Sequence, residues 1–452
     1  MKKFLVMILL GGMSMNIASA QMHLSLNQAI EIALSDNPTI KVADLEIERY
    51  DYVYKQTVSS LYPQVSVSGQ YSLAIRNQQM AEGLSFGGKN TFNATASLSL
   101  PLFAPSVYRQ MKLTKTQMAM AVESARSNRI EMVAAVRSAF YNVLLAEQSM
   151  DVLKEAYATT ESVVTNTKEL YENGLAAEYD YITAQVQLSN LKPQLLQAEK
   201  GIELTKLQLK MYLSIPEDVD INIIGELDDF RDRVLLDESY EVDLSKNTTI
   251  VNLELQSELL DHQEKLIQTT RMPTIAAFGQ ISYIGQERVN LGGLLGGMAG
   301  GGANTADQSK FWWQYPINVG AQISIPLFAG FNKTNQIKAI RNQRAQLDVQ
   351  REYAERGVKL QVQQSINTLL TARETMLANE LTVEQAQKAY EISYTRFAAG
   401  AGTILELNNS LLTLTQAQLN YSQAIYDYLS AHAAYEKALG VEAPEDMATF
   451  EE

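Results

Sequence analysis

The sequence contains no cysteine, and among its 452 residues it has only three histidines and two tryptophans. Without cysteine the chain can form no disulfide framework, no thiolate nucleophile and no thioether-linked lipid anchor. The histidines stand far apart and lack the spacing of metal ligands, and we find no set of nucleophile, base and orienting group. We therefore expect no metal site, no cofactor and no enzyme activity.

Long apolar runs are absent after the first twenty residues. Residues 1–20 combine two lysines, one short apolar run and the small-residue ending Ala18-Ser19-Ala20, which predicts a secretory signal peptide. A membrane anchor is the alternative, but the run is short and is interrupted by Gly11 and Gly12. No later segment reaches the ~18 apolar residues of a spanning helix. The chain has 51 acidic and 37 basic residues, which give a net charge of −14. Because such a chain repels phosphate groups, we do not expect nucleic acid as a partner.

The chain is a tandem duplication. Residues 35–40 align with residues 245–250 at an offset of 210, and Gly174 aligns with Gly400 at an offset of 226. Between them, LSLPLFAPSVYRQ near residue 100 matches ISIPLFAGFNKTNQ at an offset of 225. We divide the mature chain into a first repeat at 21–235 and a second at 236–452.

Both repeats have the same order of predicted elements, namely a helix, two antiparallel strands, a long helix and a return helix. The stretch 106–173 has neither glycine nor proline, and its counterpart 332–399 has one glycine. In both stretches apolar residues recur every three or four positions, as in a helix. The predicted helices are 25–60, 106–173, 177–213, 240–270, 332–399 and 403–439, and the predicted strands are 63–76, 90–101, 273–285 and 312–326.

The predicted strands alternate apolar and polar residues. From Val65 to Ile75 the odd positions are apolar or glycine, whereas the even positions from Gln64 to Ser72 are serine or glutamine. The third strand is less regular, because Phe278 and Ile284 lie on the face opposite Ile275, Ala277 and Ile281. Alternation also fits a soluble sheet with one wetted face. However, the polar faces are almost uncharged and the lengths reach the ~9–11 residues of a transmembrane strand, which favours a membrane sheet.

Two further features place these strands in a membrane. Both tryptophans fall in one aromatic cluster, which predicts a girdle at the membrane interface: Phe311, Trp312, Trp313 and Tyr315. The loops 77–89 and 286–311 would then be extracellular. A sheet in hydrocarbon has no open edge, and four strands are too few to close a barrel, so at least two protomers must share one. The predicted strand-to-helix joins contain Pro101, Phe103, Pro326 and Phe328, and Pro101 is expected to end its strand.

The two joins, the turns YENGL at 171–175 and RFAAG at 396–400, and the ending AIYDYLSAHAAYEKALG make the chain resemble the TolC family of outer-membrane factors. The resemblance covers essentially the whole mature length. It implies a mixed α and β membrane protein that forms a homotrimer, whose twelve strands build one barrel continued by a periplasmic helical barrel. It also implies an outer-membrane exit duct that contacts outer-membrane lipid, a periplasmic membrane-fusion adaptor and an inner-membrane pump of the RND, ABC or a similar class.

In that family an acidic residue six positions after each turn glycine narrows the closed periplasmic end of the duct. Here these residues are Asp180 and Glu406. The resemblance also places Asn409 in this pore constriction, although a second acid is usual there, and the sequence departs from the family again at Gly402, where a basic residue is usual. The resemblance assigns adaptor docking to the turns, with Asn173, Gly174, Leu175, Ala399, Gly400, Ala401 and Gly402.

Simpler interpretations stay open for the two acids and for the function. Glu406 follows Thr403 in a capping-box pattern, and Asp180 suits the positive end of a helix dipole. The alternative function is a secreted or surface scaffold built on a long coiled coil, with no role in transport.

Overall fold

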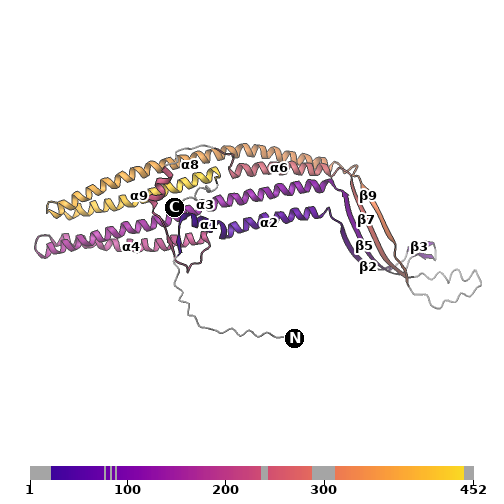
Figure 1. Cartoon of the computed structure of the whole chain (residues 1–452), viewed down its shortest axis with the longest axis horizontal. Coiled ribbons are helices and arrows are strands. Elements are labelled where there is room, and N and C mark those ends of the chain that lie inside the picture. The colour runs from indigo at the N-terminus through magenta and orange to yellow at the C-terminus, as the bar shows by residue number, and fades with distance from the viewer. Residues whose placement is uncertain are drawn as a thin grey trace, which may run out of the picture. The chain divides into compact units, whose positions relative to one another are not determined.

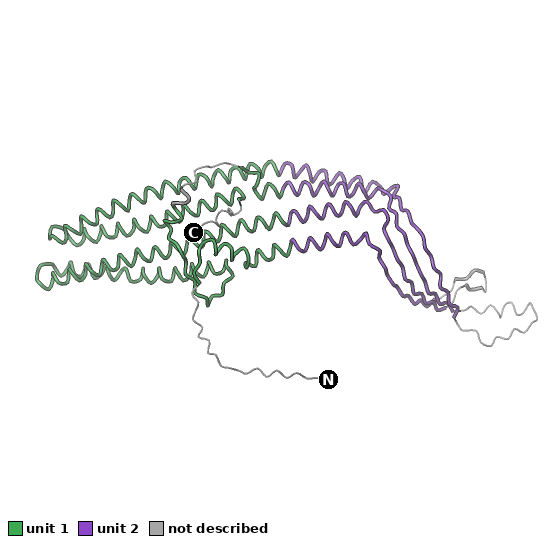
Figure 2. Tube along the Cα trace, in the orientation of Figure 1, with its two compact units in different colours: residues 1–46, 122–252, 351–452 green, residues 47–121, 253–350 purple. Residues whose placement is uncertain are grey.

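The computed structural model describes residues 22–75, 78–81, 84–86, 89–235, 243–287 and 311–441. The predicted signal peptide at 1–20 and most of the predicted loop at 286–311 lie outside these residues. The chain divides into two compact units, of which one contains residues 1–46, 122–252 and 351–452 and the other contains residues 47–121 and 253–350 (Figure 2). Within the described ranges, none of the helices combines the length and the apolarity needed to cross a bilayer.

Four helices have segments in both units: α2 (Pro38–Ser59), α3 (Pro105–Glu172), α6 (Thr248–Thr269) and α8 (Asn332–Ala398). The helix α3 begins at a proline, which is favoured in the first turn because its missing N–H would have no partner there. Both long helices end one residue before their predicted ends, each followed by an alanine or asparagine and then a glycine.

The unit of residues 47–121 and 253–350 contains an antiparallel sheet (Figure 1). Its strands are β2 (Gln64–Leu73), β5 (Asn90–Phe103), β7 (Thr274–Glu287), β8 (Phe311–Gln314) and β9 (Ile317–Ser324). They pair in the order β2, β5, β7, and both β8 and β9 pair with β7. The predicted extracellular loop 77–89 is not entirely irregular, because β3 (Gln78–Ala81) and β4 (Leu84–Phe86) form a small hairpin within it.

Two predicted strands differ from the observed ones at a proline. The predicted strand 312–326 is interrupted at Pro316, which has no N–H to donate, although the carbonyl of Pro316 still accepts a hydrogen bond from Ser282 N at 3.0 Å. Pro101 does not end its strand. The strand β5 continues to Phe103, because an irregularity in register between Pro101 and Phe103 accommodates the proline.

The apolar face of the sheet is its more exposed face. Val319, Val67 and Ile317 keep 84%, 78% and 65% of their surface accessible. The polar face is partly covered by its own cross-strand contacts, in which the hydroxyls of Ser66 and Ser97 lie 2.8 Å apart. A soluble sheet has the reverse arrangement, since water favours the polar side.

The irregular Phe278 of the third strand has a partner on the polar face. It lies opposite Gly320 on β9, and a side-chain carbon added to Gly320 would lie 2.9 Å from the Phe278 ring. The ring therefore covers a glycine across the strand, which compensates for the missing side chain there. This pairing explains how the Phe278 ring fits on the polar face of the sheet.

The other unit contains α1 (Leu26–Asp36), α4 (Glu178–Leu213), α5 (Leu227–Leu235), α9 (Ile404–Leu439) and a two-stranded parallel sheet of β1 (Met22–Leu24) and β6 (Ile221–Ile223). The sequence did not predict β1, β6 or α5. Fully buried side chains from these elements and from the long helices form its core, among them Phe140, Leu209, Leu369, Ile425 and Tyr428.

Repeated asparagines interrupt both predicted leading helices. The predicted helix 25–60 is broken at Asn37, whose extended backbone is favoured by the proline that follows it. Asn37 accepts a hydrogen bond from Thr39 N at 2.8 Å, and its amide donates to Tyr212 O at 2.8 Å. Asn247 repeats both contacts, from Thr249 N at 3.0 Å and to Ala438 O at 2.8 Å, and α6 begins at 248 rather than 240. Each asparagine thus caps one helix and binds the end of another.

Candidate functional site

The two helix turns that the sequence singles out have the same geometry. After α3, Gly174 has φ 71°, Leu175 N donates to Leu170 O at 2.8 Å, and Gly174 N donates to Tyr171 O at 2.9 Å. After α8, Gly400 has φ 70° and is flanked by the same pair of hydrogen bonds, at 2.8 and 2.9 Å. This is the Schellman arrangement, in which glycine adopts the left-handed conformation at no steric cost.

A small apolar core holds the two turns together. Val163 of α3, Ala184 of α4, and Ile404 and Leu407 of α9 are buried against one another. Tyr390 of α8 packs against this cluster, and burial raises the pKa of its phenol. The two helical hairpins therefore form one packed end, and the candidate acids lie in the first turns of its return helices.

Glu406 does not form a complete capping box in the described structure. Its backbone N–H donates to Thr403 Oγ1 at 3.2 Å, which is the first of the two hydrogen bonds. Its carboxylate Oε2 instead lies 3.7 Å from Arg396 Nη1, on the helix before the turn. The Arg396 side chain also donates to Ala401 O at 3.3 Å, so that one arginine contacts both the turn and the acid.

Asp180 has a different setting. It is half-buried in the first turn of α4, where Ala177 at the cap position makes no side-chain hydrogen bond. Its carboxylate therefore lies near uncapped backbone N–H groups, which favour negative charge. Asn409 is exposed one turn further along α9 than Glu406, and its backbone carbonyl accepts a hydrogen bond from Thr413 Oγ1 at 2.8 Å.

Gly402 leaves little room for a side chain. A carbon added there would lie 3.0 Å from Phe397 N and 3.2 Å from Arg396 Cβ. Its counterpart in the first repeat is Ala176, where the equivalent backbone hydrogen bond, to Leu170 O, is 3.3 Å long instead of 3.0 Å. The second turn is thus closed more tightly, and the side chain of Arg396 contacts it through Ala401 O.

Apolar side chains are exposed at this end. Leu175, Tyr179 and Leu405 keep 75%, 70% and 56% of their surface accessible. They belong to the turn after α3 and to the first turns of α4 and α9. Such surfaces commonly bind other proteins.

The predicted aromatic girdle is divided between the two faces of the sheet. Phe311 and Trp313 lie near Phe92, with ring centroids 5.6 and 6.4 Å from it, and Tyr283 stacks on Trp313 at 4.8 Å. Trp313 pairs with Gly285, and its neighbour Trp312 pairs with Gln286. Because successive residues of a strand point to opposite faces, Trp312 lies on the other face of the sheet. Tyr315 is exposed after β8. Phe92, Tyr71 and Tyr283 belong to this cluster although the sequence did not assign them to it.

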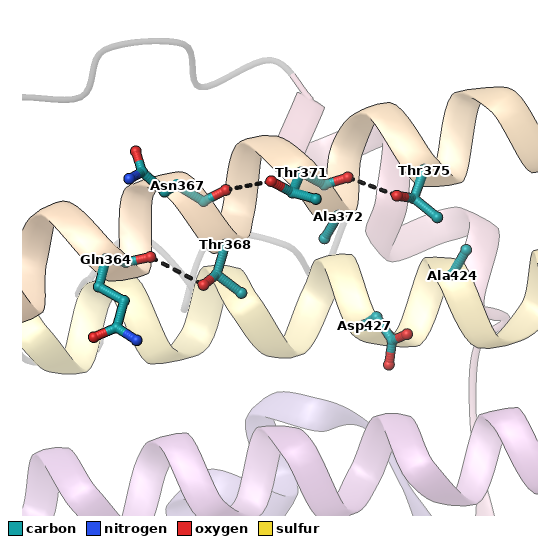
Figure 3. Close-up of a pocket in the computed structure, with 8 residues that line it drawn as sticks. All are labelled: Gln364, Asn367, Thr368, Thr371, Ala372, Thr375, Ala424 and Asp427. Carbon is teal, nitrogen blue, oxygen red and sulfur yellow. Dashed lines mark hydrogen bonds between the residues drawn. The ribbon is translucent and has the colours of Figure 1, made fainter.

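A polar hollow of about 450 Å³ lies between α8 and α9, and Figure 3 shows residues that line it. Its threonine hydroxyls, including those of Thr368, Thr371 and Thr375, donate to carbonyls of their own helix at 2.8–2.9 Å. Asp427 accepts a hydrogen bond from Gln423 at 2.8 Å. These polar groups form hydrogen bonds within their own helices and do not converge on a common point. The hollow is therefore better described as a hydrated helix surface than as a binding site.

A charged cluster that the sequence did not predict joins α5 to the long helices. Arg231 lies 3.1 Å from Glu380 and also donates to the hydroxyl of Tyr421, which donates to Asp228 at 3.2 Å. Burial, reinforced by Asp228, raises the pKa of Tyr421 well above its usual range. The cluster attaches the short helix α5 to α8 and α9. Among the described residues no group of acids and histidines could hold a metal ion.

Comparison with known proteins identifies the family. The outer membrane efflux protein family model matches residues 29–213 and 244–441. Outer membrane protein TolC of Escherichia coli (strain K12) is 22% identical over 459 residues, which cover 99% of this chain and 88% of that protein. Alkaline protease secretion protein AprF of Pseudomonas aeruginosa is 22% identical, with coverage of 78% and 70%. The probable efflux pump outer membrane protein TtgC of Pseudomonas putida is 23% identical, with coverage of 92% and 83%.

Solved structures support the same fold. CusC aligns with a TM-score of 0.69 at 14% identity over 92% of this chain and 91% of that one. The outer membrane protein VceC of Vibrio cholerae aligns with a TM-score of 0.68 at 16% identity over 92% and 96%. The resemblance inferred from the joins and turns is therefore confirmed: the chain belongs to the outer membrane efflux protein family, the TolC family, and is located in the outer membrane.

Proposed function

We propose that this protein is the passive outer-membrane exit duct of a tripartite efflux or type I secretion system. The observation that carries the proposal is the sheet whose apolar face is exposed while its uncharged polar face forms cross-strand hydroxyl contacts. Such a sheet suits lipid on one side and an aqueous lumen on the other. One relative is named as an efflux pump protein and another as a protease secretion protein. Both names support a duct, and together they allow either efflux or protein secretion as its task.

The duct is a homotrimer in this proposal. Each protomer contributes its membrane strands to one shared barrel, because an isolated sheet of this size would leave open edges in hydrocarbon. The helix α4 carries a stripe of exposed apolar residues that a neighbouring copy would cover: Ile182, Val186, Leu196, Leu204 and Met211. A periplasmic adaptor and an inner-membrane pump supply the substrate and the energy.

Residues 1–20 are a signal peptide in this proposal, and the repeats at 21–235 and 236–452 form the mature chain. N-terminal sequencing of protein isolated from the outer membrane would test this. A first residue of Gln21 is expected, and retention of Met1 would contradict the signal peptide.

The packed end with the two glycine turns forms the periplasmic entrance. In the trimer, Asp180 and Glu406 line a ring of carboxylates that favours cations over anions. Arg396 partly compensates Glu406, so Asp180 contributes more of the net negative charge. The adaptor docks on the exposed turns, at residues 173–175 and 399–402, where Leu175 offers an apolar contact.

Single-channel recording in planar bilayers tests both the duct and the ring. Wild-type protein should form pores that prefer cations, and the double variant D180A/E406A should lose much of that preference. The matched control N409A removes an exposed neutral side chain from the same helix and should leave selectivity unchanged. Unchanged selectivity in the double variant would exclude the carboxylate ring.

Cell fractionation separates the duct from the scaffold alternative. A duct should be recovered in the outer-membrane fraction as an oligomer that heating in detergent dissociates. Recovery as a water-soluble protein without pore activity would favour the scaffold.

A further inference from the structure

A groove of about 430 Å³ lies at the second strand-to-helix join, between the end of β9 and the start of α8. Its walls combine apolar and basic side chains: Ile325, Leu327, Phe328, Phe331, Arg271 and Lys333. All of them belong to the unit that carries the membrane sheet. The proposed function uses this join only to connect a strand to a helix, so the groove needs a separate explanation.

The apolar side of the groove is unusually exposed. Leu327, Phe328 and Phe331 keep 92%, 77% and 68% of their surface accessible. The two phenyl rings meet edge to face, with centroids 5.5 Å apart. Phe331 adopts this position with φ 59°, a left-handed backbone that a bulky residue rarely adopts. Three large apolar groups exposed together require an apolar covering.

The basic side of the groove has cations without acidic partners. Arg271 Nη2 donates to Thr334 Oγ1 at 3.0 Å, and Lys333 donates to the backbone carbonyl of Thr270. Neither forms an ion pair with a carboxylate in the described part of the chain. Further along α8, by contrast, Arg341 pairs with Glu264 at 2.8 Å. The groove therefore presents positive charge that the protein itself does not neutralise.

The surrounding sequence has the same charge bias. Residues 311–347 contain no aspartate or glutamate, although the chain has 51 acidic residues in total. Residues 83–122, around the first join, are also free of acids. Acids are thus absent from both strand-to-helix joins, where they would repel an anionic membrane surface.

We propose that this groove binds one anionic phospholipid of the periplasm-facing leaflet, through its headgroup phosphate and the start of its acyl chains. The phosphate lies between Arg271 and Lys333, since a guanidinium can donate two parallel hydrogen bonds to phosphate oxygens. The acyl chains lie over Leu327 and Phe328, next to Ile325 at the end of β9. The inference rests on the proposed function insofar as the strands must cross the membrane.

The duplication makes the site specific to the second repeat. Leu61 and Tyr108 occupy the first-repeat positions that match Arg271 and Lys333 at the offsets of 210 and 225. The first join also lacks the left-handed pair of Gly330 and Phe331, because α3 begins directly at Pro105. We therefore expect one such lipid per protomer.

Native mass spectrometry of the detergent-purified mature protein can test the site by titration with phosphatidylglycerol and, separately, phosphatidylethanolamine. Wild-type protein should bind phosphatidylglycerol more tightly. The variant R271Q/K333Q should bind it about 25-fold more weakly, at about fivefold for each cation removed near a membrane surface. The matched control K338Q removes an exposed cation from the same helix and should retain wild-type affinity.

A second arm distinguishes a lipid site from a site for free phosphate. Inorganic phosphate in large excess should not displace phosphatidylglycerol, and L327S/F328S should weaken lipid binding while both cations remain. Equal affinity for the two lipids, an equal loss in K338Q, or displacement by inorganic phosphate would each overturn the proposal.

Planar-bilayer recording of the same preparations keeps this proposal separate from the exit-duct proposal. R271Q/K333Q should form pores of normal conductance while losing its lipid preference. Wild-type protein that forms no pores would contradict the duct whatever its lipid binding, whereas normal pores without a lipid preference would contradict the lipid site alone.

Discussion

Replacing Gly440 by alanine should destabilise the core of this protein more than the same change at a helix turn. Gly440 ends α9 with φ 75°. An added side-chain carbon would lie 2.5 Å from Lys246 O and 3.0 Å from Asn247 Cα, both of which are backbone atoms. The backbone at Gly440 and Lys246 cannot easily move apart, because Arg126 donates to Gly440 O at 3.0 Å and to Lys246 O at 2.7 Å.

Two costs add in Gly440→Ala. A residue with a side chain in the left-handed region costs about 1–2 kcal/mol, and forcing a methyl group against fixed backbone costs about 1–3 kcal/mol more. The free energy of unfolding should therefore fall by about 2–5 kcal/mol. Gly174→Ala is the matched control, because Gly174 has φ 71° but no atom within 4 Å of the added carbon. It should show only the conformational cost of about 1–2 kcal/mol.

Urea titration followed by circular dichroism at 222 nm measures both variants. Detergent and protein concentration must be equal for all samples, because the stability of an oligomer depends on concentration. Ser214 ends α4 at the first-repeat position that matches Gly440, with φ 57°, so Ser214→Gly should raise stability by about 0.5–1 kcal/mol. If Gly440→Ala costs no more than Gly174→Ala, the steric argument is wrong.

Four further single variants test charged or titratable groups in the unit of residues 1–46, 122–252 and 351–452. Arg396→Gln should raise cation selectivity and Glu406→Gln should lower it, with a coupling of about 0.2–1 kcal/mol for an exposed pair; strictly additive effects in the double variant would show that the pair is uncoupled. Because the pKa of Tyr421 is raised, its contribution to stability is complete below about pH 10 and declines as the pH rises towards the folded-state pKa. Tyr421→Phe should flatten the loss of stability between about pH 10 and 12, and a wild-type slope would contradict this. Arg137→Met leaves Glu436 without its buried partner and should cost about 3 kcal/mol in urea titration, whereas a cost below ~1 kcal/mol would show that the pair is dispensable.

Much of the fold could be predicted because glycine, proline and alternation act locally. The glycines at 174 and 400 mark the turns after both long helices, and alternation assigns the faces of β2 and β5 correctly. The errors in the predicted strands arose at prolines, because a proline can either interrupt a strand or be accommodated within it. Pro316 interrupts a strand that the pattern continues, whereas Pro101 fits into one that it was expected to end. A proline shows that an N–H is missing, but only the partner strand decides whether that N–H was needed.

The candidate site was less predictable because its contacts join distant segments. The spacing of six residues after each glycine finds Asp180 and Glu406, but not the position of Arg396 across the turn. The cluster around Tyr421 brings together α5, α8 and α9, which are separated by up to 193 residues in sequence. No periodicity within one helix signals such a contact.

The duplication explains why the two repeats share one asparagine cap but differ in chemistry elsewhere. Asn37 and Asn247 make the same hydrogen bonds, because each repeat must begin its second helix beside the end of its return helix. Other positions differ between the repeats: Lys333 replaces the tyrosine of the first join, and Gly402 replaces an alanine. In a trimer, any residue shared by both repeats occurs six times around the axis, but a residue unique to one repeat occurs three times. The proposed lipid site and the Glu406–Arg396 pair belong to the second repeat alone. Each would therefore occur three times around the duct, alternating with the corresponding positions of the first repeat.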